Sequence, residues 1–317
     1  MSIKTRKVVI VGSGNVGSHC AFSLALQGVC DEIVMIDKIE KKANAEAVDL
    51  SDTISYLPHH VKSSKGTFED CSDADIIVVS LGVPPEPDKS RLDFLEGTIK
   101  EVDTIIEPIM KSGFDGIIVV ISNPVDVVAN YILEKTGMNK NRVFATGTTL
   151  DSARLRRILS QKTGIDAKSV QGYTMGEHGD SQMVPWSHVS LGGKPILKLI
   201  EEKREIFGDL DLDDIEKKTA FAAYEIIEGK GCTEFGIGVG LTEIIKTILH
   251  DEKKILPAST LLNGEYGQTN VFASVPVIIG SNGIEEIIEI ELTEKEKEKF
   301  NNSCNIIRSY IEKCRKI

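Results

Sequence analysis

The sequence has no excess of positive charge and no long apolar run. It contains 37 Lys and Arg residues against 48 Asp and Glu residues, which gives a net charge of −11. This acidity argues against nucleic acid or an anionic membrane as the main partner, although it does not exclude a local basic pocket for a small anion. The apolar stretch that follows the N-terminus is too short for a signal-peptide core, and nothing approaches a membrane-spanning length. We therefore expect a cytoplasmic protein.

Cysteine pairs at diagnostic spacing are also missing. The six cysteines are scattered and form neither a C-x-x-C pair nor a zinc-like pattern; they are Cys20, Cys30, Cys71, Cys232, Cys304 and Cys314. This distribution favours reduced thiols in a cytosolic protein over a disulfide framework. We expect no metal site.

The first half of the chain alternates short β-branched runs with longer helical patterns. The runs are nearly continuous in Val and Ile, as is typical of strands buried on both faces of a parallel sheet. Strands are predicted at 7–11, 32–36, 75–80, 116–122 and 142–146, and helices near 15–28, 40–53, 94–113 and 125–136. This alternation predicts an α/β fold with a doubly wound parallel sheet.

The pattern changes after about residue 147. Helices are predicted near 149–163, 213–229 and 233–250, among strands at 169–175, 186–192, 255–263, 270–278 and 285–291, and a charged run at 292–299 opens a C-terminal helix. A chain of 317 residues is long enough for two domains. We predict a first domain over residues 1–146 and a second, mixed α+β domain over residues 147–317.

A glycine-rich turn follows the first predicted strand. Gly12, Gly14 and Gly17 form a G-x-G-x-x-G pattern, and Asp37 closes the next strand 20 residues after Gly17. Such glycines allow a tight turn, close approach of a pyrophosphate and close packing of helix on strand. A carboxylate at Asp37 accepts hydrogen bonds from the adenosine ribose and repels a 2′-phosphate, so NAD is favoured over NADP. The alternative is a glycine turn in some other α/β protein.

A base, an acid that orients it and a carboxylate anchor are present in the second half. His178 lies in a glycine-flanked loop, and Asp151 and Arg154 open the helix after the fifth strand. A histidine exchanges a proton near neutral pH, and a buried aspartate holds its ring and raises its basicity. An arginine grips a planar carboxylate with two parallel hydrogen bonds. These are the parts needed to oxidise a hydroxy acid, although each residue alone is more often structural.

Four further residues are candidates for the same site. Arg91 lies in a loop that could close over the cofactor, where a cation stabilises a developing oxyanion; its alternative role is that of a solvated surface arginine. Asn123 ends the fourth strand and could bind the nicotinamide side or the substrate oxygen, or cap the helix after Pro124. Thr233 and Ile237 could face the pocket from a later helix, or simply pack.

Taken together, these motifs resemble the lactate/malate dehydrogenase family over essentially the whole chain. The matching segments, in order, are Gly12–Gly17, Asp37, Ser90-Arg91-Leu92, Ser122-Asn123-Pro124, Leu150-Asp151-Ser152-Ala153-Arg154 and Gly176-Glu177-His178-Gly179-Asp180-Ser181. The resemblance implies a Rossmann NAD-binding domain followed by a catalytic domain. It also implies catalytic roles for His178, Asp151 and Arg91, with Arg154 on the substrate carboxylate.

The resemblance further implies a small 2-oxo or 2-hydroxy acid substrate and a homotetramer. It adds Val16, Lys42, Phe68, Gly82, Val83, Ser122 and Thr146 as cofactor contacts, beside Asn123 and Ile237.

The match to the family breaks at the position that selects the substrate side chain, which is Pro85 here. Lactate dehydrogenases usually carry glutamine there, and malate dehydrogenases carry arginine. Proline can pair with no second carboxylate, and the neighbouring Glu86 and Asp88 would repel oxaloacetate. We predict an L-lactate dehydrogenase. The alternative is an L-2-hydroxyisocaproate-type dehydrogenase, which acts on larger aliphatic substrates. One methylene group changes the free energy by which an enzyme distinguishes two substrates by only about 1–3 kcal/mol, so the sequence does not decide between the two.

Two other readings are weaker: a malate dehydrogenase is disfavoured on charge, and an NAD-binding protein without turnover is disfavoured because every catalytic group is present.

A second departure concerns regulation. The chain resembles lactate dehydrogenases activated by fructose 1,6-bisphosphate at Arg156, but Gln171 replaces the histidine that they carry seven residues before the catalytic one. Neutral glutamine removes a charge-assisted bond to phosphate. We expect weak or absent activation.

Overall fold

The β-branched runs of the first half form a parallel sheet. In the computed structural model, residues 5–82 and 91–316 are described, and nine strands within these ranges make one sheet in the order β12-β11-β10-β6-β5-β4-β1-β2-β3. The parallel strands are β1 (Lys7–Val11), β2 (Glu32–Ile36), β3 (Lys62–Lys65), β4 (Ile76–Val79), β5 (Ile117–Val120) and β6 (Val143–Ala145). The predicted doubly wound α/β fold is confirmed.

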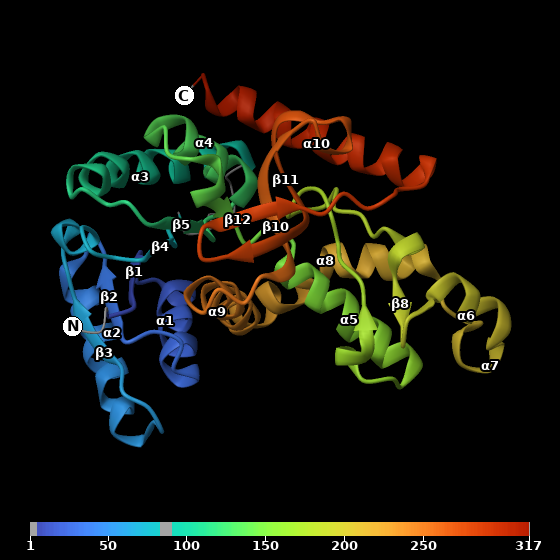
Figure 1. The fold of residues 1–317 in the computed structure, drawn as a ribbon, viewed down its shortest axis with the longest axis horizontal. Coiled ribbons are helices and arrows are strands. Elements are labelled where there is room, and N and C mark those ends of the chain that lie inside the picture. Colours follow the sequence, from blue (N-terminus) through green and yellow to red (C-terminus); the bar gives the residue numbers. More distant parts are fainter. Residues whose placement is uncertain (1–4, 83–90, 317) are drawn as a thin grey trace.

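Helices cover both faces of this sheet. The first-half helices are α1 (Asn15–Gln27), α2 (Glu40–Thr53), α3 (Arg91–Lys111) and α4 (Val125–Thr136). Helices α3 and α4 pack together with the C-terminal helix α10 (Glu294–Cys314), whereas α1 packs against α9 (Phe235–Leu249). Figure 1 shows these two groups on opposite sides of the sheet.

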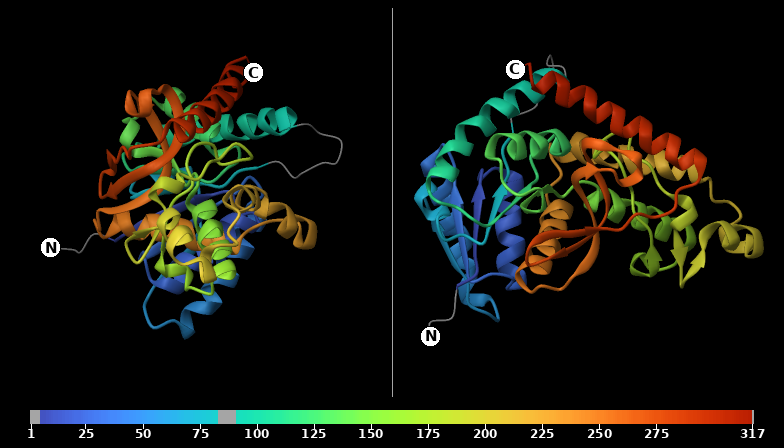
Figure 2. Two further views of the ribbon diagram at one scale, coloured as in Figure 1. Left: turned by 90° about the vertical axis from the view of Figure 1, so that its right-hand side faces the viewer. Right: turned by 45° about the horizontal axis from the view of Figure 1, so that its top comes forward.

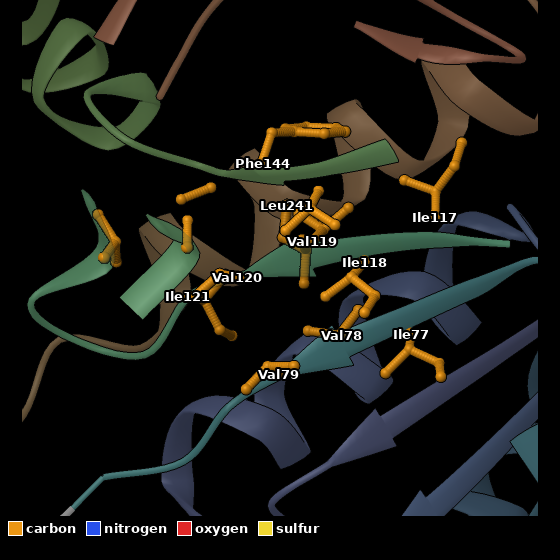
Figure 3. Close-up of a cluster of buried hydrophobic side chains, with 14 of the residues drawn as sticks. Ile77, Val78, Val79, Ile117, Ile118, Val119, Val120, Ile121, Phe144 and Leu241 are labelled. Carbon is orange, nitrogen blue, oxygen red and sulfur yellow. The ribbon is translucent and has the colours of Figure 1, made fainter. Parts of the chain in front are cut away.

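The core lies along the central strands, because parallel strands are covered on both faces. All residues of β4 and β5 are buried, and Phe144 of β6 and Leu241 of α9 have no exposed surface. Figure 3 shows these side chains gathered along the central strands, with residues of β4 and β5 labelled beside Phe144 and Leu241.

The second half adds strands to the same sheet and builds a separate cluster beside it. Strand β10 (Lys254–Asn263) runs antiparallel to β6, pairing Ser259 with Ala145, and β11 (Thr269–Gly280) and β12 (Gly283–Ile287) extend the edge. The remaining elements are α5 (Thr149–Thr163), β7 (Val170–Gln171), β8 (Ser190–Leu191), β9 (Lys194–Pro195), α6 (Ile196–Glu202), α7 (Arg204–Phe207) and α8 (Leu212–Lys230).

In this second half, a smaller apolar core forms around Leu155, Val189, Ile196 and Phe207, apart from the main one. The right-hand view in Figure 2 shows this region at the far end of the molecule from β1–β3. The boundary at residues 146 and 147 stays a proposal, because one sheet runs across it.

The secondary structure differs from the prediction in several places, among them the short elements β9, α6 and α7, which were not predicted. Strand β3 was missed because its sequence, KSSK, is polar and lies at the sheet edge. The strand predicted at 186–192 is reduced to β8, because Trp186–His188 after Pro185 form a 3-10 turn that buries the indole, whose Nε1 donates to Glu216 at 3.0 Å. The strand predicted at 169–175 ends at Gln171, just before Gly172.

The six cysteines all lie in the described ranges, and none is bonded to another. Over those same ranges, we find no helix with both the length and the apolar character needed to cross a bilayer.

We predict that Phe144→Ala destabilises the fold strongly. The ring is fully buried in the main core, so its removal leaves a cavity that costs about 3–5 kcal/mol of unfolding free energy. Urea denaturation at fixed protein concentration measures this. The matched control is Tyr56→Ala, because Tyr56 is 91% exposed and its loss should change the free energy by less than about 0.5 kcal/mol. Equal effects of the two variants would contradict this assignment of the core.

Candidate active site

The parallel sheet brings the predicted cofactor residues to one edge, because the carboxyl ends of its strands face the same way. Gly12 follows β1, Asp37 follows β2, Ser122 follows β5 and Thr146 follows β6. Residues far apart in the sequence are thereby placed along the crevice where α/β sheets bind their ligands.

The three glycines differ in what surrounds them. Gly12 has φ of +102°, and a Cβ there would lie 2.2 Å from the Ser80 carbonyl oxygen. A Cβ on Gly17 would lie 2.0 Å from the Gly12 carbonyl oxygen, so both positions require glycine for packing. A Cβ on Gly14, in contrast, would meet no atom of the described residues within 4 Å. The turn is thus closed toward the sheet and open at Gly14, beside the N-terminus of α1, where a pyrophosphate would bind.

The Asp37 carboxylate is hydrogen-bonded to the backbone of this turn. Its Oδ2 accepts the N–H of Ser13 at 2.8 Å, and its Oδ1 accepts the N–H of Ile39 at 2.9 Å. The Ser13 hydroxyl is buried and has no hydrogen-bond partner within the described part of the chain. An open glycine, a carboxylate at the end of the second strand and an unsatisfied hydroxyl fit a dinucleotide.

The remaining cofactor candidates lie on several elements and differ in their environments. The Ser122 hydroxyl joins two strand ends, since it accepts from Leu81 N–H at 2.6 Å and donates to the Val79 carbonyl at 3.1 Å. Thr146 is buried, and Gly82 is exposed after β4. The other candidates are Val16 in α1, Lys42 in α2, Phe68 after β3 and Ile237 in α9, all half-buried. Val83 lies outside the described residues.

Two of the predicted catalytic residues, Asp151 and His178, line one cavity of about 440 Å³. Asn123, Asp151, Arg154, His178 and Thr233 are all part of its wall. The alternative role of Asn123 as a helix cap was wrong, because Pro124 is the N-cap of α4 and no side chain caps it. Pro85 and the side chain of Arg91 lie outside the described part of the structure; the Arg91 backbone begins α3.

Asp151 is the centre of this wall. It is 1% exposed, and its Oδ2 lies 2.5 Å from His178 Nδ1. Its Oδ1 accepts Arg154 Nη1 at 2.8 Å, from a guanidinium that is itself buried. One carboxylate therefore orients both the imidazole of His178 and the guanidinium of Arg154.

The electrostatics of this group favour a protonated histidine. Burial opposes charge on His178, but the Asp151 carboxylate and its hydrogen bond raise the pKa of the imidazole above its usual value. Burial likewise opposes charge on Asp151, yet the charge of His178 and the hydrogen bonds from both partners lower the pKa of that carboxyl. The pair therefore favours an ionised Asp151 carboxylate beside a protonated His178.

Sequence reasoning missed most of the cavity wall. The wall also includes Ala220, Ala223, Tyr224 and Ile227 of α8 and Ile307 and Tyr310 of α10. These helices showed only ordinary amphipathic patterns, so no signal marked them as part of a site. Asp126 was missed as well, because an acidic residue in the first turn of a helix is common. Throughout the described ranges, we find no group of three or more His, Cys, Asp or Glu side chains that could hold a metal ion.

A glycine-rich turn at the carboxyl edge of a parallel sheet, together with a buried His–Asp pair and a buried arginine in one cavity, is typical of oxidoreductases that act on hydroxy acids. The family model for the lactate/malate dehydrogenase NAD binding domain matches residues 6–145, and the model for the alpha/beta C-terminal domain of the same family matches residues 148–317. The chain belongs to the lactate/malate dehydrogenase family.

Relatives agree with this assignment. L-lactate dehydrogenase 3 of Bacillus cereus is 46% identical over 98% of this chain and 99% of its own. L-lactate dehydrogenase of Fusobacterium nucleatum is 46% identical over 98% of this chain and 97% of its own. The crystal structure of the minor L-lactate dehydrogenase from Enterococcus mundtii in its ligands-bound form superposes with a TM-score of 0.95, at 41% identity and 98% coverage of both chains. The predicted family is confirmed.

We predict a pH-dependent loss of stability for Asp151→Asn. The raised pKa of His178 stabilises the fold fully below the unfolded pKa of about 6.5, and this contribution is lost as pH rises through the folded value. The lowered pKa of Asp151 stabilises the fold above about pH 4 and is lost as pH falls through the folded value. The variant should therefore lose more Tm at about pH 5.5 than at about pH 9.

Scanning calorimetry at both pH values measures this difference in Tm. Asp103→Asn is the control, because that carboxylate is 58% exposed. An equal drop in Tm for Asp151→Asn at the two pH values would contradict the assigned pairing.

Proposed function

We propose that this chain is an L-lactate dehydrogenase, which interconverts pyruvate and L-lactate with NADH and NAD. The observation that carries the proposal is the grouping of His178, Asp151 and Arg154 in one cavity beside the glycine-rich crevice. The names of the relatives support the same activity.

Arg154 binds the substrate carboxylate in this proposal. A guanidinium carries five N–H donors, so it can keep its bond to Asp151 and still form two parallel bonds to a carboxylate. Because Arg154 is only 7% exposed, little water competes for that anion. The carboxylate is thus fixed, and the keto carbon beside it is placed near His178.

His178 donates the proton. With Nδ1 held by Asp151, its Nε2 is the atom that reaches a keto oxygen. As the oxygen gains negative charge, the imidazolium transfers its proton and becomes neutral; in the reverse direction the neutral ring takes the proton from the hydroxyl. Asp151 stabilises the charged ring and fixes its orientation, as in other His–Asp pairs. Arg91 is proposed to polarise the carbonyl.

NAD is the proposed cofactor. Gly12, Gly14 and Gly17 would hold its pyrophosphate, and Asp37 its adenosine ribose. The candidates named above would complete the contacts: Val16, Lys42, Phe68, Gly82, Val83, Ser122, Asn123, Thr146 and Ile237. When bound, the reduced nicotinamide supplies the hydride that reaches C2 of pyruvate. Asp37 favours NADH over NADPH because a carboxylate repels a 2′-phosphate.

The apolar part of the cavity wall also favours a second substrate class, the larger aliphatic 2-oxo acids. Ala220, Ala223 and Ile227 make part of the cavity wall small and apolar, and Pro85 offers no group for a second carboxylate. A larger aliphatic 2-oxo acid could therefore fit, as for an L-2-hydroxyisocaproate-type dehydrogenase. Oxaloacetate is disfavoured, because an unpaired buried carboxylate costs several kcal/mol.

NADH oxidation with pyruvate, 2-oxoisocaproate and oxaloacetate tests this proposal. We expect the highest kcat/KM with pyruvate, the lowest with oxaloacetate, and higher activity with NADH than with NADPH. A kcat/KM for oxaloacetate above that for pyruvate would overturn the proposed substrate. Dominance of 2-oxoisocaproate would assign the chain to the broader hydroxy-acid class. Absence of turnover with all three would indicate an NAD-binding protein without this activity.

We also predict weak or no activation by fructose 1,6-bisphosphate. Burial lowers the pKa of Arg156, whose Nε and Nη2 each lie 3.4 Å from the Gly172 carbonyl and whose guanidinium lies 5.8 Å from the Tyr173 ring centre. Gln171, on β7, is neutral and accepts a bond from the Ser190 hydroxyl at 3.1 Å. The KM for pyruvate should therefore change by less than about threefold with the bisphosphate, and Gln171→His is the variant expected to increase the response. A large drop in the wild-type KM would contradict this.

The homotetramer and the cytoplasmic location are further parts of the proposal. Large apolar side chains are exposed on α1, α2 and α9, as expected of a face covered by another copy: Phe22, Leu26, Val48, Phe235 and Val239 are each 44–65% exposed. The unpaired cysteines support a reducing compartment.

A further inference from the structure

We propose that Glu234 is a positioning residue that couples the substrate cavity to the glycine-rich turn, by joining the loop that carries Thr233 to the N-terminal end of α1. Glu234 lies in the short loop between α8 and α9, and its side chain is only 10% exposed. Thr233, directly before it, lines the substrate cavity. The inference deepens the proposed dehydrogenase function and rests on it.

The Glu234 carboxylate contacts groups from two helices. Its Oε1 accepts the ammonium of Lys230, the last residue of α8, and its Oε2 accepts the Cys232 thiol at 3.4 Å. The same Oε2 lies 3.5 Å from Nδ1 of His19, which belongs to α1. The hydrogen bond from Lys230 lowers the pKa of the Glu234 carboxyl, burial opposes this shift, and Cys232 and His19 lower the pKa further. The carboxylate is therefore ionised at neutral pH.

The contacts of this loop lead to Asn15, the first residue of α1. His19 Nδ1 lies 2.7 Å from the Asn15 carbonyl oxygen, and because a carbonyl only accepts, this nitrogen carries the hydrogen. The Asn15 side chain also donates from Nδ2 to Cys232 Sγ at 3.4 Å. Asn15 directly follows Gly14, where the turn is open for a pyrophosphate. The residues on both sides of Thr233 are thus held to the end of α1 at which the proposed cofactor would bind.

Helices α1 and α9 pack closely beside this group. A Cβ on Gly238 would lie 3.1 Å from the His19 carbonyl oxygen, so the two backbones approach each other there. The His19 ring lies 5.2 Å from the Phe235 ring in an edge-to-face arrangement, and Lys230 Nζ lies 3.9 Å from the centre of the same Phe235 ring. A shift of α1 on cofactor binding would therefore be transmitted to the loop of Thr233.

The position of Glu234 sets it apart from an ordinary surface ion pair. Two exposed residues four apart in a helix contribute little to stability when they pair. Glu234 has a largely covered side chain and also reaches a second helix, so its carboxylate joins two elements that belong to different parts of the site. If both ligands favour the same placement of these elements, each ligand binds more tightly in the presence of the other.

Two substitutions interrupt the link from its two ends. Glu234→Gln removes the charge and keeps an oxygen for the Cys232 thiol. His19→Phe removes the ring nitrogens and keeps an aromatic ring beside Phe235.

The matched control is Glu285→Gln on β12. The Glu285 side chain is 18% exposed and also accepts one lysine and one neutral donor, Lys253 Nζ at 2.6 Å and Asn282 Nδ2 at 3.3 Å. It lies outside the substrate cavity.

The experiment measures the Kd for NADH by fluorescence, without oxamate and at one fixed oxamate concentration, together with Tm, kcat and KM for pyruvate. Oxamate is the amide analogue of pyruvate and accepts no hydride. In the wild type we expect oxamate to tighten NADH binding at least about fivefold.

In Glu234→Gln and in His19→Phe this tightening should shrink by about 3–10-fold, while the Kd for NADH alone stays within about twofold of wild type. The KM for pyruvate should rise by a larger factor than kcat falls. The double variant should lose no more than either single variant, because both substitutions remove the same link. Glu285→Gln should behave as the wild type.

The outcomes separate the two proposals. If the wild type neither turns over 2-oxo acids nor responds to oxamate, the proposed function fails. If the wild type is active and oxamate tightens NADH binding equally in the wild type and in every variant, the positioning role is overturned alone. If Glu234→Gln loses Tm and weakens NADH binding by the same factor with and without oxamate, Glu234 is a structural residue only. Additive losses in the double variant would contradict a link through His19.

Discussion

The buried carboxylate of Asp151 is the interaction on which the site depends. A carboxylate that is 1% exposed is costly unless charged donors satisfy it, and here His178 and Arg154 do so on its two oxygens. Because one group satisfies both, their spacing is fixed by the geometry of a single side chain. The imidazole of His178 and the guanidinium of Arg154 are thereby both held to one carboxylate in the cavity wall.

The sheet provides the frame for that arrangement. Its parallel strands end at one edge, so the glycine turn after β1 and the Asn123 segment after β5 open onto a common crevice. Antiparallel β10 and β11, added from the second half, then bring Ser259 and Ser274 under the histidine loop. The loop that carries His178 is therefore attached to the same sheet as the glycine-rich turn after β1, and the buried side chains of Figure 3 form the core of that sheet.

Prediction from the sequence succeeded where a residue pattern has one physical explanation. Continuous Val and Ile runs such as those of β1 and β5 are typical of strands covered on both faces, and the grouping of His178 with Asp151 was expected from their chemistry. Polar β3 was missed because an edge strand needs no apolar residues. The cavity wall from α8 and α10 depends on tertiary packing, which leaves no local signal at Ala220 or Tyr310. Asp126 was missed because an acid in the first turn of a helix is common and because its partner Ser259 lies 133 residues away in the sequence.

The most direct test of the central claim is the pH profile of pyruvate reduction by the wild type and by His178→Asn, with NADH binding measured in parallel. If His178, held by Asp151, is the proton donor, wild-type kcat/KM declines above a midpoint higher than the ordinary histidine pKa of about 6.5. His178→Asn should then bind NADH normally, lose about 10²–10⁴-fold in rate and lose that pH dependence. A variant that keeps both the rate and the midpoint of the wild type would show that the proton comes from another group.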